Sequence, residues 1–427
     1  MTSPSPSSSR SLPPRRRRRG FTLVELMVAV TGGLFVSLAV FAISRQSGRF
    51  YTRESRIADA TMGAMLGFER LKADVGRAGF LSSPNVQMDP NLCGSPATYP
   101  AMLQRLASLR IRPGQSAAAF AQHMIDNGRS PDELTLMGSY TAAEVYPVWS
   151  VDTVGATYVV QLQQNTGPLG RLAYSTSADQ LGMLQAIFGS SPGRGLRIQD
   201  QSGEVQYATI QSVATANGPQ VILSQVPALR FRDTAGNICG LKGNVTGAVV
   251  NVVNFIKYDL RNIQTQSNLG ANPAYDPVYT AGGHPYDPGT RFDLVRVELD
   301  TSGNAIQGTE ELVTEYAVDF KLGITVADSV PANKDQTLLE IPPTGAVATW
   351  AGDLVGDVTN PANGPHRVRA VRLRLSVRSQ EPDRDGNPPT PGQLFRVGLG
   401  PSAGPPFARV RSVQADIALN NQTAVFY

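Results

Sequence analysis

The sequence predicts an α+β fold, in which a long N-terminal helix packs against a head built on an antiparallel β-sheet with short extra helices. Two patterns support this prediction. Phe21 to Ile43 is a run of 23 residues that contains one ionisable side chain, Glu25. In the second half of the chain, apolar and polar residues alternate with a period of two, which is typical of strands that bury one face.

The N-terminal tail sets the orientation of the chain. Its first 14 residues are rich in serine and proline, and we expect them to be disordered. Five consecutive arginines follow, Arg15 to Arg19. Arginines beside a first hydrophobic segment stay in the cytoplasm during insertion. The sequence therefore predicts a cytoplasmic N-terminus and export of everything after Ile43.

The apolar run is long enough to span a membrane. At 1.5 Å per helical residue it covers roughly 34 Å, compared with about 30 Å for the hydrocarbon core of a bilayer. Glu25 is its unusual residue, because a carboxylate in a membrane is costly unless it is paired or lies near the interface. The partner we expect is the α-amino group created by a cut before Phe21, on a neighbouring copy or subunit.

The segment Gly20-Phe21-Thr22-Leu23-Val24-Glu25-Leu26, preceded by the arginines, resembles the processing site of type IV prepilins and pseudopilins. The resemblance implies that residues 1–20 are a leader, which prepilin peptidase removes by cleaving between Gly20 and Phe21. It also implies that the new amino group of Phe21 is methylated. Glu25 would then help to dock the subunit into a bundle of helices.

Two other readings of this segment are open. A secretory signal would be cut after the apolar run, where Val40-Phe41-Ala42 offers a small-residue site. The length of the run and the presence of Glu25 inside it argue against such a signal. A plain single-pass anchor would explain the arginines but neither Gly20 nor Glu25.

The basic character of the chain belongs to the leader. The whole sequence has a formal charge of +4 and a pI of about 9.1. Residues 1–20 contain six arginines and no acidic residue, so their removal changes the formal charge from +4 to −2. The mature protein is therefore nearly neutral, which argues against nucleic acid as a partner.

Two cysteines, Cys93 and Cys239, lie in the part expected to be exported. An oxidising compartment favours a disulfide between them, and two separate buried thiols are the alternative. Neither has the CxxC spacing of a zinc or redox site.

The helix is expected to continue past the membrane to about Ala78, with Gly79 as its stop. Its upper part shows one apolar stripe, with charged residues on the other faces. The stripe comprises Met65, Phe68, Leu71, Val75 and Ala78, and the charged residues are Glu69, Arg70, Lys72, Asp74 and Arg77. We therefore divide the chain into a leader (1–20), a long helix (21–79, with 21–43 in the membrane) and an extracytoplasmic head (80–427).

The head is predicted to contain short helices and many strands. The helices are expected at Ser116 to Asn127 and at Ser177 to Phe188, the second with a capping box of Ser177 and Gln180 and with Gly189 as its stop. The strands are expected around 134–137, 158–162, 205–210, 221–223, 250–260, 312–324 and 371–377. In the 312–324 segment, Glu315, Asp319 and Lys321 are predicted on the outward face. Three turns of related sequence start at Asp233, Asp300 and Asp383 and are consistent with hairpins.

The order of several short blocks resembles the PilW-type minor pilins of type IV pili. These blocks include Phe68 to Asp74, Arg77-Ala78-Gly79-Phe80, Val253 to Tyr258, Val368 to Leu373 and Arg411 to Asn420. Here Cys93 comes later than the cysteine that often follows the Ala-Gly-aromatic step in that family. The head is also longer than usual, so disulfide pairing and loop roles do not carry over.

The resemblance implies a minor pilin in the bacterial inner membrane with a periplasmic head, which moves to the pilus and the cell surface on assembly. Its implied partners are other minor and major pilins, prepilin peptidase and the pilus assembly platform, with a tip adhesin as a further candidate. The implied role is to initiate the filament and to lie at or near its tip. The alternative is a minor pseudopilin of a type II secretion system, although such heads are usually smaller.

No feature of the head predicts an enzyme, a cofactor or a metal site. His123, His284 and His366 are far apart, and neither a nucleophile elbow nor an HExxH motif is present. Asp383 and Asp385, with Asn387, resemble half of a calcium loop, but Leu394 stands where the loop's glutamate would be. Arg372, Arg374 and Arg378 are predicted on an outward strand face, where they would meet phosphate or pair with acids on a neighbouring strand.

Overall fold

The computed structural model describes residues 20–114, 127–164, 169–170, 176–232, 239–241, 247–263, 291–327, 336–340, 364–380, 394–397 and 407–422. Several predicted features lie outside these residues. They are most of the leader, the helix expected at Ser116 to Asn127, the turns at Asp233 and Asp383 with the calcium-like motif, and His123 and His284. The chain divides into two units, Met1–Ser55 and Arg56–Tyr427, which are described separately.

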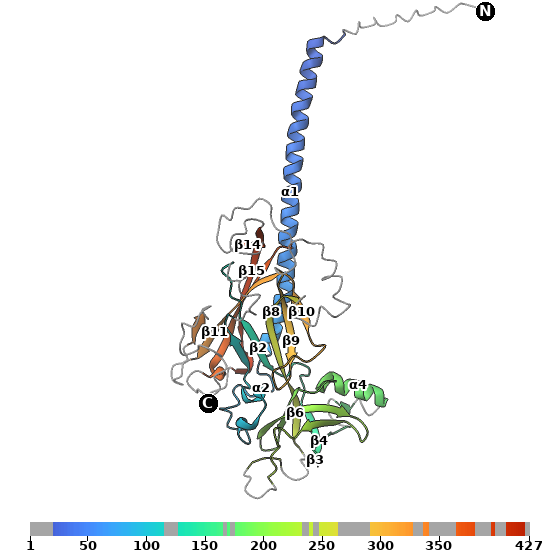
Figure 1. Cartoon of the computed structure of the whole chain (residues 1–427), viewed down its shortest axis with the longest axis vertical. Coiled ribbons are helices and arrows are strands. Elements are labelled where there is room, and N and C mark those ends of the chain that lie inside the picture. Colours follow the sequence, from blue (N-terminus) through green and yellow to red (C-terminus); the bar gives the residue numbers. More distant parts are fainter. Residues whose placement is uncertain are drawn as a thin grey trace, which may run out of the picture. The chain divides into compact units, whose positions relative to one another are not determined.

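Helix α1 (Leu23–Gly76, 54 residues) dominates the N-terminal part (Figure 1). It continues without interruption through Gly32, Gly33 and Gly48. It ends at Gly76, and a turn follows in which Gly79 has a φ of +75°. The backbone N–H of Gly79 donates to the carbonyl of Met137 at 2.8 Å, so the chain joins the head directly after the helix.

Residues 56–76 of α1 pack against the head. The side chains that they bury differ in part from the apolar stripe that the sequence predicts. Phe68, Leu71 and Val75 are buried in a core cluster, as expected. Met65 was wrongly placed on this face: it is 55% exposed, and the small residue Ala64 is buried instead. Asp74 was wrongly placed among the outward charges, since it is only 5% exposed.

The first sheet of the head contains ten strands, all paired in antiparallel fashion in the described part. Its strands are β1 (Leu109–Arg112), β2 (Glu133–Gly138), β3 (Tyr146–Val154), β4 (Thr157–Leu162), β5 (Gly195–Gln199), β6 (Val205–Ala214), β7 (Gln220–Ser224), β8 (Val249–Arg261), β9 (Asp293–Leu299) and β10 (Glu311–Thr314).

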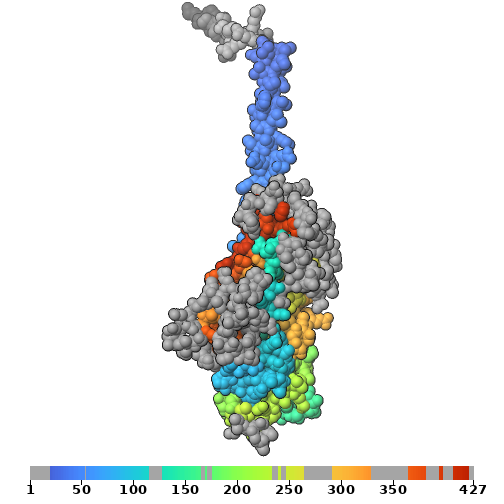
Figure 2. All heavy atoms as spheres, turned by 60° about the vertical axis from the view of Figure 1, so that its left-hand side comes forward, coloured from blue at the N-terminus to red at the C-terminus, as the bar shows by residue number. Residues whose placement is uncertain are grey.

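Part of this sheet closes into a small barrel. The pairings run β8-β3-β4-β7-β6-β5 and return to β8, because Tyr146 pairs with Val250 and Leu196 pairs with Val252. The inward residues of these strands form one core cluster with Leu184 and Phe188 of α4 (Ser177–Phe188). Strands β3, β4 and β6 of the barrel, in shades of green, lie at one end of the head (Figures 1 and 2).

Strand β8 is shared between the barrel and the rest of the sheet. Its first half, Val249 to Val253, pairs with its neighbour β5 and so closes the barrel. Its second half, Asn254 to Arg261, pairs with β2 and β9. The side chains of that second half that face α1, such as Ile256 and Tyr258, belong to the core cluster of Phe68 and Leu71.

The second sheet has the order β12-β11-β13-β15-β14. Its strands are β12 (Gln336–Glu340), β11 (Ala317–Ala327), β13 (Val368–Arg378), β15 (Phe407–Ala418) and β14 (Leu394–Arg396), again antiparallel. Apolar residues of β11 and β13 share one core with α1, β1 and β2. Short helices complete the described head: α2 (Ala101–Gln104) and the 3-10 turns Pro96–Thr98, Pro365–Arg367 and Asn420–Gln422.

The α+β class, with a long apolar N-terminal helix and an antiparallel head, is confirmed. The helix at Ser177 to Phe188 and its stop at Gly189 are also confirmed, but the predicted cap is wrong by one residue. Thr176 is the N-cap, because its hydroxyl accepts the N–H of Asp179 at 3.3 Å. Asp319 and Arg378, predicted to face outward, are 2% and 1% exposed.

Candidate processing and assembly site

The predicted cleavage bond lies just outside the helix. Gly20 and Phe21 precede α1 and have no helical structure, and both are exposed. A side chain at Gly20 would meet nothing within 4 Å. A peptide bond in an exposed, non-helical segment can enter the extended cleft of a peptidase without unwinding the helix.

Thr22 and Glu25 form a reciprocal capping box at the start of α1. The N–H of Glu25 donates to the Thr22 hydroxyl at 3.2 Å, and the N–H of Thr22 donates to Glu25 Oε2 at 3.0 Å. The Thr22 hydroxyl also lies 3.1 Å from the same oxygen and donates to it. In the single, uncleaved chain Thr22 therefore supplies hydrogen bonds to the carboxylate.

The helix presents an apolar surface behind this cap. Its large side chains from Leu23 to Ile43 are exposed: Leu23, Val24, Leu26, Met27, Val28, Val30, Leu34, Phe35, Val36, Leu38, Val40, Phe41 and Ile43. Among the described residues, α1 is the helix that is long and apolar enough to cross a membrane. Contact of this apolar surface with water is unfavourable. Lipid or other apolar helices would cover it and remove that cost.

Comparison with known protein families supports a processing site at the same place. A family profile described as the prokaryotic N-terminal methylation motif matches residues 15–31. No curated protein and no solved structure matches the chain. The motif, which includes the start of the exposed apolar helix, supports a membrane-anchored precursor that is processed at its N-terminus. More particularly, it supports a type IV pilin or pseudopilin precursor that prepilin peptidase processes.

A buried polar cluster fastens α1 to the head. Asp74 Oδ2 accepts hydrogen bonds from Arg296 Nε on β9 and from the Tyr258 hydroxyl on β8, both at 2.8 Å. The Tyr140 hydroxyl donates to the carbonyl of Asp74 at 3.0 Å. Burial, followed by the charge of Asp74, raises the pKa values of Tyr258 and Tyr140. Both phenols therefore stay protonated and act as donors.

Gly67 lets the helix approach the head closely. A Cβ at this position would stand 1.6 Å from Thr314 Oγ1 and 2.8 Å from the carbonyl oxygen of Val313. Both residues belong to the end of β10. No side chain larger than hydrogen fits there without movement of the strand end.

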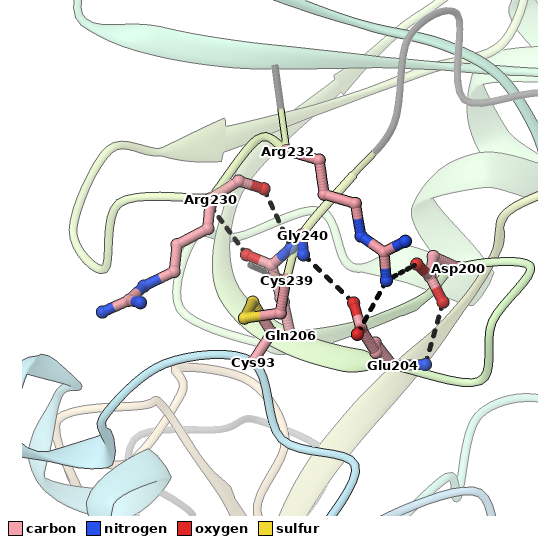
Figure 3. The surroundings of a disulfide bond; sticks show 8 residues. All are labelled: Cys93, Asp200, Glu204, Gln206, Arg230, Arg232, Cys239 and Gly240. Carbon is pink, nitrogen blue, oxygen red and sulfur yellow. Dashed lines mark hydrogen bonds and ion pairs between the residues drawn. A yellow bond between two sulfur atoms is a disulfide. The ribbon is translucent and has the colours of Figure 1, made fainter. Parts of the chain in front are cut away.

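Cys93 and Cys239 form a disulfide with an S–S distance of 2.06 Å (Figure 3). The Cys93 N–H donates to the carbonyl of Val205 at 2.9 Å, which holds one side of the bond against β6. Gly240 follows Cys239 with a φ of +128°, and its N–H donates to Glu204 at 3.1 Å. The bond joins segments that are 146 residues apart in the chain.

An ion pair lies beside the disulfide. Arg232 is 2.7 Å from Glu204 and 3.8 Å from Asp200. The hydrogen bond from Arg232 lowers the pKa of Glu204. Glu204 therefore stays ionised and can accept the Gly240 N–H as well, so it links the turn at Arg232 to the segment that carries Cys239.

The arginines considered for phosphate binding have protein partners. Arg372 makes two hydrogen bonds to Asp416 on β15, at 2.7 and 3.0 Å, and Arg374 lies 3.3 Å from Asp319. Arg378 was wrongly predicted on the outward face: its guanidinium is buried, 4.7 Å from the centre of the Tyr316 ring. Among the described residues, no group of three or more His, Cys, Asp or Glu could hold a metal ion.

Sequence reasoning missed Thr22 and the partners of Asp74. The capping box could have been found, because threonine followed three residues later by glutamate ahead of an apolar run is its signature. The Asp74–Arg296 pair joins residues more than 200 positions apart, and no local pattern indicates it.

Proposed function

We propose that this protein is a minor pilin of a type IV pilus, of the PilW type, that helps to initiate the filament and lies at or near its tip. The head has no catalytic role in this proposal and carries no cofactor. The observation on which it rests is the processing motif, followed by a self-capped Glu25 and an exposed apolar helix. The order of sequence blocks that resembles PilW-type pilins supports the choice of subclass.

The capping box suggests how Glu25 is stabilised while the subunit is in the membrane, before it assembles with other subunits. While Thr22 donates to Glu25, the carboxylate is not left without hydrogen bonds. Cleavage after Gly20 would create an α-amino group on Phe21, one residue from the cap. That cation can compete for Glu25 and can come from the same chain or from a neighbour, since a charge-assisted bond is stronger than a neutral one.

The first test is intact mass and N-terminal sequencing of the protein from its native membrane. The proposal requires a chain that begins at N-methylated Phe21. A chain that begins near Ile43, or one that keeps its arginines, would exclude filament assembly. Replacement of Gly20 by a larger residue should block cleavage, and a functional but uncleaved variant would contradict the proposal.

The second test separates processing from assembly. Glu25→Ala should leave cleavage intact and reduce incorporation into filaments, whereas Thr22→Val should affect incorporation less, because it removes only the cap. A deletion strain complemented with each variant can be scored for surface pili and for secretion of type II substrates. Loss of secretion with normal pili would favour the alternative, a minor pseudopilin of a type II secretion system.

A further inference from the structure

A hollow of about 500 Å³ lies on the outer surface of the barrel. Its lining consists of Trp149, Ser150, Gln161, Leu162, Gln163, Gln164 and Asn217, from β3, from β4 and the chain just after it, and from the turn between β6 and β7. This volume falls within the range of small-molecule sites. Processing and assembly at the N-terminus make no use of it.

Trp149 lies at a β-bulge, on the outward face of β3. Val148 pairs with Leu162 and Ser150 pairs with Gln161, so Trp149 is an extra residue in β3. Val148 is buried in the barrel core, whereas Trp149 is 65% exposed. An exposed indole offers a flat apolar face with an N–H donor at its edge, which suits contact with a ligand that has an apolar face and polar edges.

Most polar side chains around the indole are amides, and hydrogen bonds within the protein fix the positions of two of them, Gln161 and Gln163. Gln161 donates to the carbonyl of Asn217 at 2.9 Å and accepts from Gln220 at 2.8 Å. It keeps one N–H and one lone pair for another partner. Gln163 donates to the carbonyl of Val148 at 3.3 Å. Within the described residues, the side-chain amides of Gln164 and Asn217 make no hydrogen bond.

Charge limits the class of ligand. None of the seven described lining residues is charged. The nearest ionisable group in the hydrogen-bond network is Asp152, whose carboxylate accepts the Ser150 hydroxyl at 2.9 Å. A polyanion would be repelled by this carboxylate and would find no cation in the lining.

We propose that this hollow is a binding site for a neutral oligosaccharide. A pyranose ring with equatorial hydroxyls has an apolar C–H face, which can stack on the indole of Trp149. Its rim of hydroxyls both donates and accepts hydrogen bonds, as do the surrounding amides of Gln161, Gln164 and Asn217. The site does not depend on the role of the chain in a pilus.

Isothermal titration calorimetry on the full chain in phospholipid nanodiscs tests the proposal without a glycoside detergent, which could compete. The probes are cellohexaose, chitohexaose and maltohexaose, with a hexagalacturonate and a 20-nucleotide oligo-dT as acidic probes. We expect at least one neutral hexasaccharide to bind at concentrations below about 1 mM, and more tightly than either acidic probe.

Matched variants locate the site. Trp149→Ala should weaken binding at least about tenfold, because it removes the stacking surface. Trp149→Phe should retain part of the affinity. Asn217→Ala should weaken binding by about two- to tenfold, since it removes one exposed hydrogen-bonding group. Val154→Ala, on the same strand but outside the hollow, should leave binding unchanged.

Several results would overturn the proposal. They are the absence of binding of all three neutral sugars up to about 10 mM, equal binding by wild type and Trp149→Ala, and tighter binding of an acidic probe. If no sugar binds and Trp149→Ala instead abolishes capture of another pilin subunit, the hollow is a protein contact. Circular dichroism of each variant shows whether the fold is retained, and Trp149→Phe remains informative if Trp149→Ala unfolds.

Discussion

Asp74 of α1 and Arg296 of β9 form a buried ion pair, with 2.8 Å between Oδ2 and Nε. Asp74→Ala should destabilise the head by about 3–5 kcal/mol, because Arg296 would keep its charge inside the protein without its main partner. Urea unfolding of the full chain in detergent measures this change. Lys72→Ala is the control: it removes the exposed pair with Glu69 and should cost less than about 1 kcal/mol. Equal losses in the two variants would contradict the prediction.

Two glycines of α1 should respond in opposite ways to alanine. Gly67→Ala would place a Cβ 1.6 Å from Thr314 Oγ1 and should cost about 1–3 kcal/mol of stability. Gly63→Ala meets nothing within 4 Å and should gain up to about 1 kcal/mol from helix propensity. Melting temperatures of the two variants, measured side by side, test this difference. Similar values would mean that α1 does not approach Thr314 so closely.

Loss of the disulfide should lower the stability of the head substantially. Because it joins positions 146 residues apart, it restricts the unfolded chain strongly, and its removal should cost about 2–5 kcal/mol. The Cys93→Ser/Cys239→Ser double variant avoids a free thiol. Its melting temperature should be lower than that of the wild type and should not respond to dithiothreitol, whereas the wild type should. A wild type that is insensitive to dithiothreitol would contradict the prediction, provided that mass spectrometry shows full reduction.

Acid should destabilise the head through His366. This side chain is 2% exposed, and its Nδ1 lies 3.2 Å from Asn85 Nδ2. Burial, reinforced by the charges of Arg367 and Arg369, lowers the pKa of His366 from 6.5 to about 4. The unfolded chain therefore takes up this proton first as the pH falls below 6.5. The stability contributed by neutral His366 is present above that pH and is lost progressively toward about pH 4.

Comparison with His366→Gln isolates this contribution. Burial raises the pKa of Asp293 from 3.8 to about 6, so the folded state takes up that proton first and gains stability as the pH falls through this range. The two groups therefore act in opposite directions in the wild type. The stability difference between wild type and His366→Gln should shift in favour of the variant between about pH 7 and pH 4.5. A difference that is constant over this range would contradict the assignment.

Local signals accounted for the parts of the fold that the sequence predicted well. The apolar run defined the start of α1, and several period-two segments predicted strands that are present, such as β13 around Leu373. The single strand expected at 312–324 was wrong: this segment forms two strands in different sheets, β10 and β11, which are separated by a turn in which Tyr316 has a φ of +55°. The helix at Ser177 to Phe188 was found with its correct bounds. Its cap was misplaced because both Thr176 and Ser177 are suitable residues, and only the geometry selects the first.

Three of the errors concern charged residues that are buried. Periodicity placed Asp74, Asp319 and Arg378 toward solvent, because a single charged residue is normally exposed. Each of them has partners from a distant segment, such as Arg129 for Asp319. Closure of the barrel was also missed, because it depends on the pairing of β5 and β3 with β8, which no local pattern specifies. The β-bulge at Trp149 was missed as well, because it is a register shift between β3 and β4.

Strand β8 belongs both to the barrel and to the rest of the first sheet, and this has a mechanical consequence. At one end of β8, Tyr258 donates a hydrogen bond to Asp74 of α1. At the other end, Val250 and Val252 pair with β5 in the wall of the barrel. Tension applied through the last turns of α1 would therefore load the barrel along a continuous backbone, without a weak joint between separate domains. Under pulling force, the head should yield as one unit in a single large rupture.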